Sequence, residues 1–116
     1  MPFDHALTDR IREYLDDRAV IAEVPLFGGL AFLAHGRMFA GVFASDLWVR
    51  VRPRNWAAAL NRPGARPLTV GNRPPARDCL YVAGEALDDE ALDRWLTAAW
   101  DSLPETRPRL VLAISR

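Results

Sequence analysis

At 116 residues, half of them apolar and 26% charged, the chain has the size and composition of one folded domain, which excludes disorder of the whole chain. No apolar run approaches the roughly 20 residues that span a bilayer, and the N-terminal residues lack the basic and apolar segments of a signal peptide. The net charge is zero, and Cys79 is the single cysteine, so an internal disulfide is excluded and a cytoplasmic location is expected.

The first expected element is an amphipathic helix over residues 5–18. Leu7, Ile11 and Leu15 recur at a helical spacing and form one apolar stripe, while charged residues occupy the other faces. A helix of this kind buries its stripe against a larger body, so we expect it on the surface of the domain.

Short strands replace the helical pattern after this helix. Pro25 is expected to end the first strand, because proline has no N–H to donate to a ladder. The pairs His35-Gly36 and Ser45-Asp46 predict tight turns. The strands of the resulting antiparallel meander are expected at residues 20–24, 30–34, 38–44 and 47–52.

Two of these strands differ in how many of their faces are apolar. In strand 38–44 both faces are apolar, with Ala40 on one and Phe39 on the other, so both are expected to be covered. In strand 47–52 apolar residues alternate with a second set that is expected to meet solvent or a partner. That set is Trp48, Arg50 and Arg52.

The second half of the chain predicts two more helices. Pro53 suits the first turn of a helix, and Asp88 is the expected N-cap of the last helix, which Pro104 ends. The elements expected here are a helix at 53–60, a loop at 61–77 with a short strand at 67–70, a strand at 79–83 and a last helix at 89–103.

These elements together predict an α+β domain over residues 1–104. We expect an antiparallel β-meander sheet of about five strands, with the N-terminal, short middle and C-terminal helices packed on it. Residues 105–116 are predicted to form a mobile C-terminal tail.

A series of motifs in order along the chain carries a family resemblance. Residues 26–33 read Leu-Phe-Gly-Gly-Leu-Ala-Phe-Leu, a Gly-containing turn follows, and Met-Phe-Ala-Gly-Val comes next. With the later segments 47–51 and 64–68, this pattern resembles the TfoX N-terminal domain family over roughly residues 5–104. The signature residues here are Phe27, Gly28, Gly29, Gly36, Met38 and Phe39.

The Phe-Gly-Gly step is interpreted as structural. Gly28 and Gly29 allow a turn or bulge and a close backbone approach, and Phe27 is expected to supply core area. The alternative is a phosphate-cradling loop, but no Gly-Lys-Ser/Thr follows and the segment does not open a helix.

Residues with catalytic or metal-binding chemistry are few and scattered. Cys79 is interpreted as a small buried residue, because a reactive thiol needs an activating environment. His5, His35 and one cysteine fall short of the four ligands typical of a structural zinc site. The acids at 88–90 are explained by their place at a helix N-terminus. We therefore expect no catalytic residue, no cofactor, no metal and no enzymatic activity.

An arginine-rich segment without any acidic residue runs from 50 to 77. Its members are Arg50, Arg52, Arg54, Arg62, Arg66, Arg73 and Arg77. Together with Trp48 as a stacking surface, they form a candidate patch for nucleic acid or a small anion. The other interpretation is that these arginines pair with the acidic helices or are merely solvated.

The resemblance implies a regulatory or interaction module. Bacterial TfoX regulators act in transcriptional control of natural competence and carry a second, C-terminal domain, and this chain ends where that domain would begin. We therefore expect a stand-alone module that acts through protein contacts, as a homodimer or with another protein, and not on a membrane. Trp48 and Trp100 are the candidate exposed aromatic residues, and the alternative function is binding of nucleic acid or a small anion through 50–77.

Overall fold

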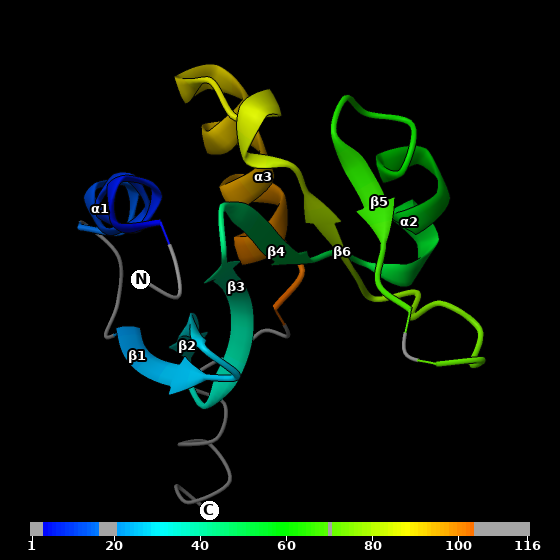
Figure 1. The fold of residues 1–116 in the computed structure, drawn as a ribbon, viewed down its shortest axis with the longest axis horizontal. Coiled ribbons are helices and arrows are strands. Elements are labelled where there is room, and N and C mark those ends of the chain that lie inside the picture. The colour runs from blue at the N-terminus through cyan, green and yellow to red at the C-terminus, as the bar shows by residue number, and fades with distance from the viewer. Residues whose placement is uncertain (1–3, 17–20, 70, 104–116) are drawn as a thin grey trace, which may run out of the picture.

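The computed structural model describes residues 4–16, 21–69 and 71–103. The predictions for Pro104 and for the tail at 105–116 lie outside these residues. Within them the chain forms three α-helices, a short 3-10 helix and six strands, and Figure 1 shows their arrangement. Their order is α1 (His5–Tyr14), β1 (Ile21–Leu26), β2 (Gly29–Ala34), β3 (Arg37–Phe43), β4 (Asp46–Arg50), α2 (Pro53–Ala59), β5 (Ala65–Pro67), β6 (Cys79–Val82), η1 (Gly84–Ala86) and α3 (Asp89–Asp101).

The strands form one antiparallel sheet in the order β1-β2-β3-β4-β6-β5. The first four follow one another as a meander, and β6 then pairs with β4, which leaves β5 at the far edge. The α+β class and the antiparallel sheet are confirmed, with six strands where about five were expected.

Three predicted boundaries are corrected. β1 continues through Pro25 to Leu26, because β1 is an edge strand and proline needs no ladder partner on its outer side. The short strand expected at 67–70 lies at Ala65–Pro67, where it pairs with β6. The first helix ends at Tyr14, and Asp16 follows it, where an acid is unfavourable next to the negative end of the helix dipole.

One face of the sheet forms the hydrophobic core. Cross-strand rows such as Leu30–Val42–Leu47–Val82 are buried, and α3 packs on β3 and β4 with α1 beside it. Trp95 and Leu96 of α3 and Ile11 of α1 fill this side and are at most 2% exposed. The alternation predicted for the fourth strand is therefore correct on this face.

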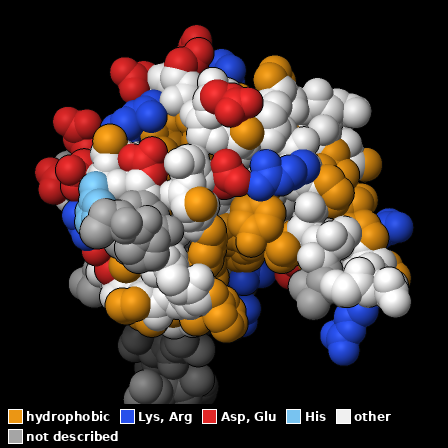
Figure 2. Space-filling view, viewed as in Figure 1, with side chains coloured by type: hydrophobic (Ala, Val, Ile, Leu, Met, Phe, Trp, Pro, Cys, Tyr) orange, Lys and Arg blue, Asp and Glu red, His pale blue; other side chains and the backbone are white. Residues whose placement is uncertain are grey.

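The opposite face, which we call the outer face, is defined by the row Val24–Ala31–Gly41–Trp48–Tyr81–Arg66 and its neighbours on the same side. Among the described elements no helix lies in front of β3, β4 and β6 in Figure 1. In the same view, Figure 2 shows hydrophobic side chains gathered over these strands. The residues of β3 are nevertheless buried or half-buried on both faces: on this side Gly41 is buried and Phe43 is half-buried, as expected for a central strand.

A β-bulge changes which face Phe39 occupies. The register between β2 and β3 shifts between Phe32 and Leu33, so the strict alternation of β3 is broken. Phe39 and Ala40 are both fully buried, and Phe39 contacts Trp100 of α3 edge-on with ring centroids 5.3 Å apart. The prediction that Phe39 faces away from Ala40 is corrected by this extra residue.

Candidate functional site

The turn between β1 and β2 exposes an aromatic side chain. Phe27 and Gly28 form a two-residue loop with φ angles of +50° and +79°, the pattern of a type I′ hairpin. Phe27 is 91% exposed. The prediction that Phe27 belongs to the core is wrong, because its turn conformation directs it away from the sheet.

The two glycines of the signature have different roles. Gly28 has a positive φ, which glycine tolerates without strain. Gly29 is close-packed: a Cβ there would lie 2.3 Å from the carbonyl oxygen of Val42 and 2.5 Å from the ring of Phe43. The predicted close backbone approach is therefore found at Gly29, and the turn is found at Gly28.

The outer face carries two arginines that are already neutralised. Arg50 lies 5.6 Å from the centroid of the Trp48 ring and pairs with Asp78 at 3.3 Å. In the same way Arg66 lies 5.5 Å from the Tyr81 ring and pairs with Asp46. The acids that pair with them come from the sheet and the loop before β6, not from the helices.

Both tryptophans expected to be exposed are covered. Trp48 is 8% exposed beneath Arg50, so it does not offer a stacking surface. Trp100 is half-buried against Phe39. Sequence reasoning missed the exposure of Phe27, the exposed large aromatic residue in the described part of the chain, although its place beside Gly28 in a short apolar hairpin was the available signal.

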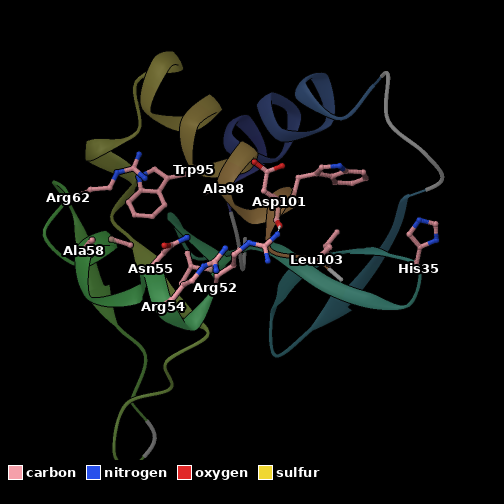
Figure 3. A pocket seen from close by; sticks show the side chains of 13 residues that line it. His35, Arg52, Arg54, Asn55, Ala58, Arg62, Trp95, Ala98, Asp101 and Leu103 are labelled. Carbon is pink, nitrogen blue, oxygen red and sulfur yellow. Dashed lines mark hydrogen bonds between the residues drawn. The ribbon is translucent and has the colours of Figure 1, made fainter. Parts of the chain in front are cut away.

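A wide cleft opens between α2 and α3, away from the outer face (Figure 3). It encloses about 940 Å³, and its described lining residues are His35, Val51, Arg52, Arg54, Asn55, Ala58, Ala59, Arg62, Trp95, Ala98, Trp100, Asp101 and Leu103. At one end Arg62 lies over Trp95, with its guanidinium carbon 3.8 Å from the ring centroid. Arg52 and Arg54 reach into the middle of the cleft opposite Asp101.

A second hollow of about 540 Å³ adjoins the cleft at Arg52 and Arg54. Its described lining adds Arg37, at the start of β3, and the Arg50–Asp78 pair. Arg37 was not part of the predicted patch, since it precedes the acid-free segment.

The structure divides the predicted patch. Arg50, Arg52 and Arg54 gather where β4 meets α2, and Arg62 lies across the cleft from Arg54. The other members lie elsewhere: Arg66 is on the outer face, Arg77 lies 5.4 Å from the Trp56 ring, and Arg73 is in the loop before β6.

Cys79 is buried at the start of β6, at 4% exposure. Burial, with a smaller contribution from Asp78, raises the pKa of its thiol to about 11, against a usual value of about 8.5. The surroundings therefore hold Cys79 as a neutral thiol, as the sequence predicted for a buried residue.

We expect Cys79 in the folded chain to resist a thiol-specific reagent at pH 8.5, whereas the unfolded chain reacts fast. The unfolded thiol ionises above about pH 8.5 and the folded one does not until about pH 11, so Cys79 lowers folding stability as the pH rises through this window. Labelling with and without urea, followed by mass spectrometry, measures the difference. Equal labelling rates in the two states would contradict it.

The described parts of the chain hold neither a cluster of metal ligands nor a membrane-spanning helix. No group of three or more His, Cys, Asp or Glu side chains there could hold a metal ion. No helix in those parts is both long and apolar enough to cross a membrane.

Comparison with known proteins supports the fold and the family. A crystal structure of a protein from Pseudomonas syringae, a structural genomics target, has a similar fold, with a TM-score of 0.57 at 10% identity, covering 78% of this chain and 93% of that one. A comparison with curated proteins finds no match. The family model of the TfoX N-terminal domain matches residues 13–103, which include both hairpins, the arginine-lined cleft and the helix α3. This chain belongs to the TfoX N-terminal domain family.

Proposed function

We propose that this chain is a non-enzymatic regulatory module that works by binding another protein chain, in the simplest case a second copy of itself. The contact surface consists of the β1–β2 hairpin and the adjoining part of the outer face. A cytoplasmic location and a part in transcriptional regulation, competence included, belong to the same proposal and rest on the sequence resemblance.

The observation that carries the proposal is the exposed Phe27. Exposing 91% of an aromatic side chain to water is unfavourable compared with burying it. The positive φ of +50° adds backbone strain, because Phe27 is not a glycine. Asn or Asp would relieve both costs in this turn. Large aromatic side chains of this kind act as anchors when a partner buries them.

Apolar surface continues from the hairpin onto the sheet. Val24 of β1 is 41% exposed, and Leu26, Leu33 and Phe43 on the same face are half-buried. The nearest charged residue of β1, Glu23, is already paired with Arg12 on the opposite face, at 2.7 Å. An uncharged apolar surface next to an aromatic anchor is the composition expected at the centre of a protein–protein contact.

Phe27→Asn tests this proposal. We expect the wild-type chain to be dimeric in size-exclusion chromatography with light scattering, and Phe27→Asn to be monomeric. The variant should unfold no more easily than the wild-type monomer, because Asn-Gly is the preferred sequence of a type I′ turn.

His35→Asn is the matched control, since His35-Gly36 forms the same turn in the next hairpin, with φ angles of +54° and +79°. This variant makes the same kind of turn substitution and should remain dimeric. A wild-type chain that stays monomeric at every concentration, or a Phe27→Asn variant that stays dimeric, would contradict self-association through the hairpin.

A further inference from the structure

The cleft between α2 and α3 holds positive charge that exceeds the negative charge of its described lining residues. Of its described lining residues, Arg52, Arg54 and Arg62 are cationic and Asp101 alone is acidic, a formal excess of two positive charges. Arg52 donates to the backbone carbonyl oxygen of Asp101 and not to its carboxylate. No carboxylate in the described residues pairs with Arg54 or Arg62.

Arg62 is the most constrained of these cations. Its guanidinium carbon lies 3.8 Å from the centroid of the Trp95 ring, and this cation–π contact restricts the position of the group at the cleft wall. Burial, and then repulsion by Arg94, lowers the pKa of Arg62 from its ordinary value. The surroundings therefore disfavour its charge, and an anion in the cleft would relieve this cost.

The geometry of the cleft suits a small ligand with more than one negative group. Arg54 lies at the start of α2 and Arg62 lies three residues beyond its last residue, Ala59, so the two cations come from different ends of this helix. Between them the lining is small and apolar, with Ala58, Ala59 and Ala98. The forked donors of arginine bind phosphate and carboxylate oxygens in pairs.

We propose that this cleft binds a small organic polyanion, with phosphate or carboxylate groups held by Arg62 at one end and by Arg54 and Arg52 in the middle. The site is separate from the hairpin surface, and its ligand is a small molecule and not a nucleic acid. Of the seven arginines predicted from the sequence, Arg66 and Arg50 already have acidic partners, so a continuous basic track does not form.

Calorimetric titration of the full chain with inorganic triphosphate and with citrate tests the proposal and separates the phosphate from the carboxylate source. Sodium chloride of matched ionic strength is the blank. We expect saturable binding of at least one of the two. Arg54→Gln and Arg62→Gln should each raise its Kd by about tenfold or more, the effect of losing a hydrogen bond to a charged group.

Each variant separates binding in the cleft from another explanation of anion binding. Arg54 has no partner in the described residues, so Arg54→Gln should keep the fold even if Arg62→Gln weakens the contact with Trp95. Arg73→Gln removes a charge outside the cleft and should leave Kd unchanged. Equal losses in Arg73→Gln would mean diffuse electrostatics, and a loss in Arg37→Gln but not in Arg62→Gln would place the anion in the second hollow; either result overturns the proposal.

Two further measurements test the proposed anion site. Absence of saturable binding to both probes overturns it, as does binding of an oligonucleotide without binding of either small anion. Phe27→Asn should bind the anion as the wild type does, so that the cleft and the hairpin surface are judged independently.

Discussion

Gly29→Ala is expected to destabilise the fold by roughly 3 kcal/mol, at the upper end of the cost of over-packing a well-packed site. The added methyl would lie 2.3 Å from the carbonyl oxygen of Val42, a backbone atom of the neighbouring part of the sheet, and 2.5 Å from Phe43. The ring of Phe43 can rotate away, but the carbonyl cannot move without distorting β3. Such a loss is a large share of the 5–15 kcal/mol of a typical domain.

Gly36→Ala is the matched control for this prediction. Gly36 has a φ of +79° and no atom within 4 Å of its added Cβ, so the substitution costs only backbone strain, about 1–2 kcal/mol. Urea unfolding followed by circular dichroism, at one fixed protein concentration, gives both free energies. Equal losses in the two variants would show that close packing at Gly29 has no special role.

Trp95→Ala is expected to cost about 3–5 kcal/mol of folding free energy, the range for removing a large aromatic side chain from a core. Trp95 is 2% exposed and is the largest of the fully buried side chains. It also supports Arg62, so the same substitution should remove the orientation of that guanidinium in the cleft. Trp95→Phe keeps most of the apolar area and should cost clearly less.

A double-mutant cycle separates the two roles of Trp95. Arg62→Gln and Trp95→Leu, alone and combined, should give a coupling free energy of about 0.5–2 kcal/mol in urea unfolding, because the two groups are in direct contact and leucine has no ring. Additive effects would mean that Arg62 does not depend on the ring, and the argument for a fixed guanidinium in the cleft would fail.

Much of the fold could be predicted because it depends on local rules. Period-two alternation in 47–52 identified the buried Leu47 and Val49, and the Gly-containing turn at His35-Gly36 identified a hairpin. The N-cap role of Asp88 is confirmed by its side chain accepting a hydrogen bond from the backbone N–H of Ala91 at 2.8 Å. Each of these features needs only residues a few positions apart.

The candidate site could be predicted only in part, because it depends on which distant residues meet. Seven arginines close together in the sequence offered a candidate patch, yet the sheet places Arg66 beside Asp46, and the packing of the segment after α2 on α3 places Arg62 against Trp95. Nothing near 62 in the sequence identifies Trp95 as its neighbour. The exposure of Phe27 was also missed, since an apolar residue is expected in a core unless the turn geometry is known.

The sequence by itself determined the α+β class, the family, the hairpin turns and the buried face of β4, because periodicity and turn chemistry are local. Only the tertiary structure decided that β6 lies between β4 and β5 and that the described helices leave the outer face open. It also decided that, among the described lining residues, three arginines and a single acid line one cleft. The physical reason is that alternation in the sequence specifies only that a strand has one apolar and one polar face. Packing between distant segments decides what lies against each face.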